Sequence, residues 1–296
     1  MRKVLVSVIL NTYNNEKTVQ KALDTILAQK TEFDFEILVY DDASTDKTAE
    51  IIQLYSMKYP EKIKPIFQTE NQRTKGVNIT NEYQYTRVQG KYIAFSEPDG
   101  YWTNENKLQT QLDLLEHHPD ISMCAHSSII LTDEINKKKK KLVLSKRNCV
   151  MKIERIISLS DLVPVNSIMY RANSDEEAMK FCNKYPFMYA GVLQSAIHGG
   201  VLYLGEIMSV CTEKRTENVK DEEKRAELLN KLCEMLEDID KLTNYEYSQE
   251  IELRKTEQKF KLLRLQKNYK EMNEKKYKRE LKKLTLKEKF KVKFSR

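Results

Sequence analysis

Short hydrophobic runs and amphipathic segments alternate along the first 110 residues of the chain. The hydrophobic runs are rich in β-branched and aromatic residues, which favour buried strands. They are Val4–Leu10, Phe35–Tyr40, Ile63–Gln68 and Lys91–Ser96. Apolar spacings and capping residues predict helices that open at Asn14-Asn15-Glu16, run from Ser44-Thr45-Asp46 to about Tyr59, and cover Thr80–Gln89. Strands that alternate with helices indicate an α/β fold, with a mostly parallel sheet and helices on both faces.

The pattern changes after Gly205, because the rest of the chain contains neither Gly nor Pro. In the final third, Leu229, Leu232, Leu236 and Ile239 recur at three- and four-residue steps, which predicts one apolar stripe of a long helix. The sequence therefore predicts an α/β domain over residues 1–215 and a helical, basic C-terminal region over residues 216–296.

Composition excludes several classes of protein. With 296 residues, 40% of them hydrophobic, the chain is neither collagen-like nor wholly disordered. Its apolar runs are shorter than the roughly 20 residues of a membrane span, and the N-terminus lacks the small-residue cleavage site of a signal peptide. The five cysteines form no C-x-x-C pair, so neither a disulfide framework nor a zinc site is expected. These features predict a cytoplasmic protein with reduced thiols.

The net charge of +7 belongs to the C-terminus, because Tyr269–Arg296 carries 12 Lys and Arg against 4 Glu. A stripe of Leu286, Phe290 and Phe294 among these lysines predicts a helix that binds an anionic membrane surface, and a solvated helix end is the alternative. The run Lys137–Lys141 is interpreted as a solvated turn, and no motif for binding nucleic acid accompanies either basic segment.

Polar clusters follow three of the predicted strands. They are Asn11-Thr12-Tyr13-Asn14, Asp41-Asp42-Ala43-Ser44 and Glu97-Pro98-Asp99-Gly100. In open α/β sheets, ligands bind beyond the carboxyl ends of the strands, so these clusters are expected along one edge. An aromatic ring, paired carboxylates and helix N-termini suit a nucleoside and a metal-bound diphosphate. Asp41 and Asp46 also fit a purely structural role in a turn and a helix cap.

These clusters and their flanking residues resemble the signature blocks of family-2 glycosyltransferases. The similar segments are Val6–Asn14, Tyr40–Thr48, Gly90–Phe95, Glu97–Thr103, Lys107–Pro119 and Leu204–Val210. The resemblance covers residues 3–212. It implies a GT-A fold, a nucleotide-diphosphate sugar donor, a divalent metal (Mn or Mg) and inversion at the anomeric carbon. Residues 1–215 would then be a nucleotide-sugar-binding domain.

The resemblance also assigns roles to individual residues. It places Asn11, Thr12 and Tyr13 at the donor site and implies that Asp41 or Asp42 contacts the nucleoside. Other donor contacts implied by the family pattern are Asn71, Arg73, Lys75 and Glu97, with Asp99 as the metal ligand. A solvated loop lysine is the alternative for Lys75. Trp102 is interpreted as packing beneath the metal loop.

The catalytic half departs from the family pattern. A position that often holds a second Asp is Gly100, and the stretch Asn183–Tyr189, where the general base is expected, contains no acid. Asn183 and Lys184 occupy the expected base slot, and Cys211-Thr212 replaces a common Tyr-Arg pair. Inversion needs a group that takes the proton of the acceptor hydroxyl. The catalytic residue is therefore unassigned.

Two functions remain open at this point. The first is a bacterial hexosyltransferase of cell-surface polysaccharide synthesis, with a UDP-sugar donor and a glycan or lipid-linked acceptor, at the inner face of the plasma membrane. The second is a weak or silent homologue that binds nucleotide sugar or partners an active transferase in a homo- or hetero-oligomer. A nucleotidyltransferase ranks last, because no glycine precedes Gly76 to build its phosphate loop.

Overall fold

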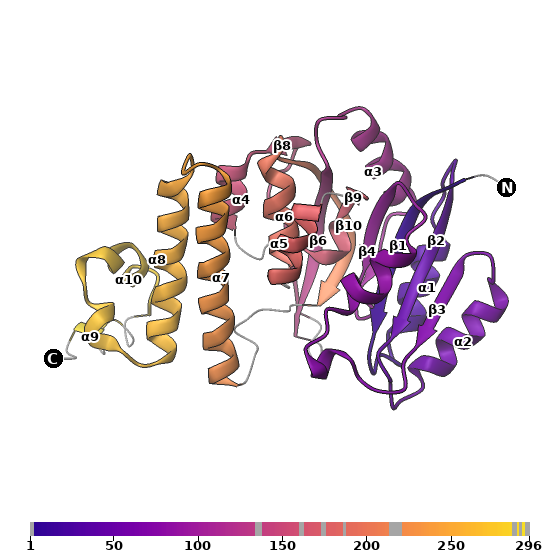
Figure 1. Cartoon of the computed structure of the whole chain (residues 1–296), viewed down its shortest axis with the longest axis horizontal. Helices are drawn as coiled ribbons and strands as arrows, with labels where there is room; N and C mark the ends of the chain where they lie inside the picture. The colour runs from indigo at the N-terminus through magenta and orange to yellow at the C-terminus, as the bar shows by residue number, and fades with distance from the viewer. Residues whose placement is uncertain are drawn as a thin grey trace. The chain divides into compact units, whose positions relative to one another are not determined.

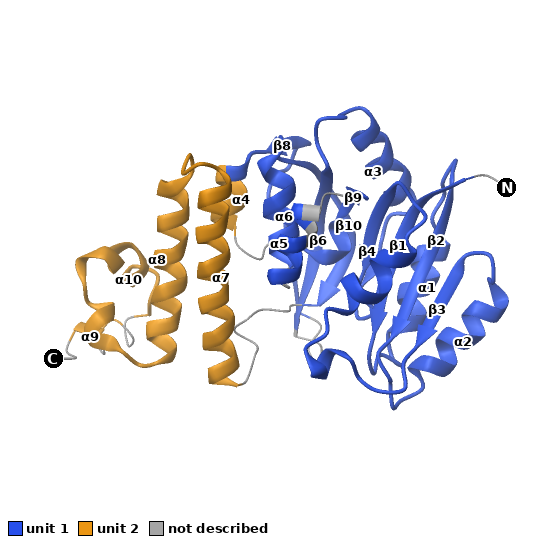
Figure 2. Ribbon diagram, in the orientation of Figure 1, with its two compact units in different colours: residues 1–153, 161–213 blue, residues 154–160, 214–296 orange. Residues whose placement is uncertain are grey.

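A computed structural model of the chain describes residues 3–133, 138–159, 163–172, 176–185, 188–212, 221–285, 289 and 292–293. The chain divides into two compact units, residues 1–153 with 161–213, and residues 154–160 with 214–296 (Figure 2). The predicted domain boundary at residue 216 falls within residues 213–220, which lie outside the described part of the chain. The short segment 154–160 groups with the helical unit, although the sequence analysis placed it in the first domain.

The first unit is built on a ten-stranded mixed sheet with the order β3-β2-β1-β4-β9-β6-β10-β5, in which β7 also pairs with β6 and β8 with β10 (Figure 1). The strands are β1 (Val4–Thr12), β2 (Asp34–Asp41), β3 (Ile63–Phe67), β4 (Tyr92–Ser96), β5 (Tyr101–Trp102), β6 (Met123–Asp133), β7 (Lys138–Leu142), β8 (Cys149–Met151), β9 (Met169–Arg171) and β10 (Val201–Thr212). The pairs β3-β2, β2-β1, β1-β4 and β6-β10 are parallel. The short strand β9 is antiparallel to both β4 and β6.

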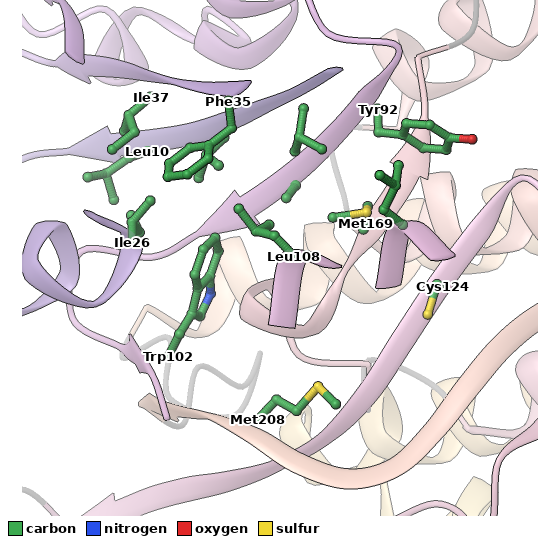
Figure 3. Close-up of a cluster of buried hydrophobic side chains, with 14 of the residues drawn as sticks. Leu10, Ile26, Phe35, Ile37, Tyr92, Trp102, Leu108, Cys124, Met169 and Met208 are labelled. Carbon is green, nitrogen blue, oxygen red and sulfur yellow. The ribbon is translucent and has the colours of Figure 1, made fainter. Parts of the chain in front are cut away.

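Helices cover the two faces of this sheet. They are α1 (Val19–Leu27), α2 (Thr48–Lys58), α3 (Lys107–Glu116), α5 (Glu176–Lys184) and α6 (Met188–Ile197). Helix α4 (Ile153–Leu159) groups with the second unit. The main core joins α1 and α3 to one face of the sheet, with Leu10, Ile26, Ile37, Tyr92 and Leu108 among its buried side chains (Figure 3). Because side chains alternate along a strand, Ile93, Met123 and Tyr170 point to the opposite face.

The structure confirms the four predicted strands and the α/β class, and it corrects three local predictions. Helix α1 begins at Val19, after a turn in which Asn15 O accepts hydrogen bonds from Thr18 N and Val19 N. Residues Thr80–Gln89 are not an α-helix but a π-helical turn and a 3-10 turn, because Gln84 and Arg87 donate to the carbonyl oxygens of Leu38 and Val39.

The third correction concerns the lysine run. Lys138–Leu142 forms the exposed strand β7, which pairs antiparallel with β6, so the predicted solvated turn is wrong for these residues. Exposed lysines are typical of sheet edges, where their charge opposes pairing with another chain. The rest of the run, Lys137, lies outside the described residues.

The second unit is helical. Its elements after α4 are α7 (Glu222–Leu242), α8 (Ser248–Leu265), α9 (Tyr269–Met272), a 3-10 turn over Lys275–Tyr277, and α10 (Lys278–Leu281). Asp221 begins α7 by accepting hydrogen bonds from Glu223 N and Lys224 N, at 3.0 and 3.1 Å. The predicted apolar stripe of α7 is confirmed as buried.

A second hydrophobic cluster closes the C-terminal part of this unit. Its buried members are Phe260, Leu263, Met272, Tyr277, Leu284 and Val292. Helix α10 ends at Leu281, and Leu284 packs into this cluster from the turn that follows. The proposed membrane-facing stripe of Leu286, Phe290 and Phe294 lies outside the described residues. Within the described parts of the chain, none of the helices has the length and apolar character that crossing a bilayer demands.

Candidate functional site

The parallel pairing of β1 with β2 and β4 brings the three predicted polar clusters to one edge of the sheet. Thr12 lies opposite Asp41 in the β1-β2 register, and Leu10 lies opposite Ser96 in the β1-β4 register. The chain leaves each of these strands at the same edge, as expected for parallel neighbours. The donor-site residues predicted from the sequence therefore surround a common edge.

Asp41 braces the loop that follows β2. Its Oδ1 accepts hydrogen bonds from Thr12 Oγ1 at 2.8 Å and Ser44 Oγ at 2.6 Å, and its Oδ2 accepts from Ser44 N at 3.0 Å. Its side chain is buried, and the loop includes Ala43 at a φ of 61°. The structural role considered for Asp41 is therefore present, and the carboxylate fixes the shape of the edge.

Asp42 ties the segment after β3 to the end of β2. Its two carboxylate oxygens accept from Gln72 N at 2.8 Å and Arg73 N at 3.1 Å, while Asn71 Nδ2 donates to Asp42 O at 3.2 Å. These bonds place the side chains of Arg73 and Lys75 at the edge, where both are exposed. Lys75 pairs with Glu70, and this ammonium group lowers the pKa of the Glu70 carboxyl.

Asn11 near the end of β1 and Tyr13 just after it have different roles. Asn11 Nδ2 donates to Thr80 Oγ1 at 2.9 Å, and its Oδ1 accepts from Gln84 Nε2 at 2.8 Å, so the amide joins β1 to the π-helical turn. Tyr13 is 47% exposed. Of these two residues, Tyr13 presents a ring to solvent, while Asn11 positions the neighbouring segment.

The turn Glu97–Gly100 follows β4 and is closed by a hydrogen bond from Gly100 N to Glu97 O at 3.1 Å. Asn166, which is fully buried, accepts from Glu97 N at 2.6 Å. A Cβ atom added to Gly100 would lie 2.1 Å from Asn166 Nδ2 and 2.7 Å from Val210 O. The missing second Asp of the family pattern is therefore explained by packing, because this position has no room for a side chain.

Asn166 is a site residue that the sequence analysis missed. It lies in the 3-10 turn Val165–Ser167, and its Nδ2 reaches Val210 O at 3.4 Å, so one amide links the turn after β4 to strand β10. Thr212 at the end of β10 adds a second link by donating to Asp99 O at 3.1 Å. No local pattern around Asn166 signals this role, because its partners are distant in sequence.

A buried lysine lies beneath this turn. Lys107 Nζ donates to Gln111 Oε1 at 2.7 Å and lies 4.1 Å from the centre of the Trp102 ring. Burial lowers the pKa of Lys107 to about 7. Burial, with the nearby charge of Glu97, raises the pKa of the Cys211 thiol to about 11. The predicted packing of Trp102 is confirmed, since only 3% of the residue is exposed.

The expected base slot lies at the C-terminal end of α5. Asn183 Oδ1 accepts a hydrogen bond from Asn81 Nδ2, and Asn81 directly follows the Thr80 that bonds to Asn11. Tyr185 and Tyr189 are both buried, and Pro186 and Phe187 lie outside the described residues. The structure thus connects the slot, through amides and hydroxyls, to the sheet edge at the ends of β1, β2 and β4, called the donor edge below.

Glu97 and Asp99 are suited to complete a metal site together with a substrate. Both are half-buried on one tight turn, and nowhere in the described ranges do three or more His, Cys, Asp or Glu side chains form a metal-binding group by themselves. Mg²⁺ is commonly held by one or two carboxylates, with phosphate oxygens and water supplying the remaining ligands. The donor set on this turn fits such an ion.

Comparisons with known sequences place the chain in a family. The model of glycosyl transferase family 2 matches residues 7–176. The uncharacterized protein Rv1520 of Mycobacterium tuberculosis is 30% identical over 204 residues, which cover 69% of this chain and 57% of that protein. The putative teichuronic acid biosynthesis glycosyltransferase TuaG of Bacillus subtilis is 34% identical over 113 residues, 38% of this chain and 42% of that relative. The chain thus spans less than two thirds of the length of these relatives.

Solved structures share the fold. Staphylococcus aureus TarS 1–349 in complex with UDP-GlcNAc gives a TM-score of 0.61 at 16% identity, covering 98% of this chain and 78% of that one. The mannosyltransferase PcManGT of Pyrobaculum calidifontis, in complex with GDP-Man and Mn²⁺, gives 0.53 at 16% identity and covers 80% and 64%. With the signature blocks at one sheet edge and the family match over more than half its length, the chain belongs to glycosyltransferase family 2.

Proposed function

We propose that this chain transfers a sugar from a nucleoside-diphosphate donor, with inversion, to an acceptor hydroxyl in cell-surface polysaccharide synthesis. The observation that carries the proposal is the convergence of the ends of β1, β2 and β4, which gathers Tyr13, Asp42 and Asp99 at one edge. Structures of similar fold bind UDP-GlcNAc and GDP-Man, and relatives named for teichuronic acid and poly(ribitol-phosphate) suggest a glycan or lipid-linked acceptor.

In this proposal, each part of the edge has a distinct role. Tyr13 stacks on the base, and the loops braced by Asp41 and Asp42 form the walls of the nucleoside site. Arg73 and Lys75 face the diphosphate, and Asp99 with Glu97 holds the divalent ion. When bound, Mn²⁺ or Mg²⁺ neutralises negative charge on the leaving diphosphate. We take a uridine nucleotide as the first donor to test.

A second candidate is a homologue with weak or absent transfer, and the base slot favours it. Asn183 and Lys184 offer no carboxylate, and the amide of Asn183 is engaged with Asn81. A tyrosine with an ordinary pKa near ~10 is a poor base at neutral pH, and Tyr185 and Tyr189 are buried. Donor binding and transfer are therefore tested separately.

Calorimetry with UDP-GlcNAc, UDP-glucose and GDP-mannose in the presence of Mn²⁺ tests donor binding. We expect a uridine donor to bind the wild type and to lose most of its affinity in Asp99→Asn. Asp113→Asn is a matched control, because Asp113 is an exposed carboxylate on α3 outside the edge. Absence of binding by every nucleotide sugar would overturn the proposed function. Full affinity in Asp99→Asn would show only that Asp99 is not a metal ligand, and the proposed function would stand.

Turnover of the bound donor tests the base slot. We expect the wild type to transfer slowly, and Asn183→Asp or Lys184→Asp to accelerate transfer by supplying a carboxylate. Asn183→Ala is the control, because it breaks the bond to Asn81 without adding an acid. If the wild type turns over at ordinary enzymatic rates of ~1–10³ s⁻¹, the interpretation of this slot is wrong.

A further inference from the structure

A cavity of about 520 Å³ lies within the first unit, outside the donor edge. It is bounded by the second face of the sheet at β4, β6 and β9, by helices α5 and α6, and by the segment 81–88. Most of its wall is apolar or aromatic. Among its lining residues are Tyr85, Ile93, Met123, Tyr170, Met188 and Gly191. Its volume is in the range of sites that bind small molecules.

One end of this cavity lies beside the expected base slot, although Asn183 and Lys184 are not among its lining residues. Asn81, which donates to Asn183, lines the cavity, and so do Cys182 and Met188, which flank the slot in sequence. From Met188 the lining follows α6 to His198, a length of about 15 Å at the rise of an α-helix. An occupant that extends along α6 would therefore have one end where an acceptor hydroxyl is required.

Several polar groups of the cavity wall already have hydrogen-bond partners. The hydroxyls of Tyr85 and Tyr170 hydrogen-bond to each other at 2.6 Å, so each hydroxyl already has a partner. Arg171, the lining cation, already donates to Tyr92 and to the backbone oxygens of Leu115 and His118. Because these polar groups already have partners and most of the wall is apolar, the wall favours an uncharged, apolar occupant over a phosphate or a carboxylate.

Two residues of the cavity wall, Gly191 and Gln194, leave room and an unpaired polar atom for a ligand. Gly191 lies in the interior of α6, where glycine costs about 1 kcal/mol relative to alanine, and a Cβ there would meet only Cys182 Sγ, at 3.9 Å. Gln194 Oε1 is buried and has no hydrogen-bond partner among the described residues. Buried polar atoms normally have partners, so this oxygen is available to a hydroxyl or an amide of a ligand.

We infer that this cavity binds the apolar portion of the acceptor, an alkyl or prenyl chain whose hydroxyl-bearing end lies at the base slot. The acceptor role rests on the proposed function, whereas the binding of an apolar chain does not. The proposal gives α6 a specific task, because Gly191 keeps open the volume that the chain occupies. It also predicts that acceptors without an apolar group bind weakly.

The test is calorimetry of the full chain with butyl, hexyl and octyl β-glucoside below their micelle concentrations. We expect affinity to rise with chain length, by up to about fourfold per added methylene, the ratio that ~0.8 kcal/mol represents. Gly191→Leu fills the cavity and should reduce octyl glucoside affinity at least tenfold. Gly191→Ala adds one methyl with room to spare and is the matched control. No dependence on chain length, or full affinity in Gly191→Leu, would overturn the inference.

A second readout does not depend on how the variants fold. Octyl glucoside should slow the modification of Cys182 by N-ethylmaleimide in the wild type, and Cys149, which does not line the cavity, is the internal control. Equal rates with and without octyl glucoside would contradict the site. UDP-GlcNAc affinity is measured on the same samples. If octyl glucoside binds and no nucleotide sugar does, the transferase proposal fails and the apolar site stands.

Discussion

The packing of Gly100 against Asn166 allows the turn after β4 to be perturbed by a single methyl group. In Gly100→Ala, the new Cβ would lie 2.1 Å from Asn166 Nδ2 and 2.7 Å from Val210 O, well inside any real contact. Asn166 has to move, and its 2.6 Å bond to Glu97 N is then lost. An unsatisfied N–H costs about 1–3 kcal/mol and overpacking a further 1–3 kcal/mol, so we expect a loss of roughly 2–6 kcal/mol of stability.

Urea and thermal unfolding followed by tryptophan fluorescence measure this loss in the relevant unit. Trp102 is the sole tryptophan of the chain, and it is buried in the first unit, so its emission reports on that unit. For a domain of 150–250 residues, about 2–4 °C of melting temperature corresponds to 1 kcal/mol. The expected fall in melting temperature is therefore roughly 4–24 °C. Calorimetry with a UDP-sugar should also show weaker binding, because Glu97 and Asp99 lie on the displaced turn.

A double-mutant cycle tests the assigned cause. Asn166→Ala removes the nearest clash with the new methyl and leaves only Val210 O close to it. We therefore expect Gly100→Ala to cost at least about 1 kcal/mol less in the Asn166→Ala background than in the wild type. Costs that add within about 0.5 kcal/mol would refute the proposed contact.

Further predictions follow from other single sites. Gly191→Ala should raise the stability of the first unit by about 0.5–1 kcal/mol in the same unfolding assay, and a loss would show that α6 needs glycine for its backbone. The pKa of Lys107 is about 7 in the folded chain against an ordinary 10.5, so the unfolded chain binds the extra proton between these values. The stability of the wild type should therefore rise from pH 7 to 10.5, and Lys107→Met should lack this rise. If the urea midpoints of wild type and variant change equally over this pH range, the lowered pKa of Lys107 is refuted. Tyr13→Ala should leave stability within about 0.5 kcal/mol and weaken UDP binding by about 1–3 kcal/mol, and unchanged affinity would exclude stacking. Replacing the exposed Lys275 and Lys282 by Glu should reduce sedimentation of the protein with anionic vesicles but not with neutral ones. Equal pelleting of wild type and variant with anionic vesicles would exclude a membrane-binding role for the basic tail.

The parts of the fold that depend on local pattern were predictable from the sequence. The strands β1, β2, β3 and β4 are runs of β-branched and aromatic residues, and the stripe of α7 repeats every three or four residues. Their parallel order then places Tyr13, Asp42 and Asp99 at one edge, because a strand ends where its apolar run ends. The proposed donor half of the site follows from this step.

The parts that depend on distant partners were not predictable. Thr80–Gln89 has a helical composition, but Gln84 and Arg87 satisfy carbonyl groups of β2, and the segment adopts tighter and wider turns instead. Lys107 opens an amphipathic helix and would be read as exposed, yet it is fully buried against Trp102 and Gln111. Asn166 has no local signal at all. The partners of Gln84, Arg87 and Asn166 lie more than one element away, whereas Lys107 is buried by its own helix and the adjacent strand β5.

The donor loops have a structural role that is independent of chemistry. Asp41 braces one loop, Asp42 joins two strand ends, and Asn11 anchors the π-helical turn, so these residues stabilise the sheet edge whether or not a sugar is transferred. Their presence is therefore compatible with both candidate functions, and the base slot distinguishes them. Substitution at Asn183 should change turnover and leave UDP affinity within about twofold, since less than ~0.5 kcal/mol is expected from a site that makes no nucleotide contact. Substitution at Tyr13 should do the reverse and lower affinity first, because its exposed ring belongs to the donor edge and not to the slot.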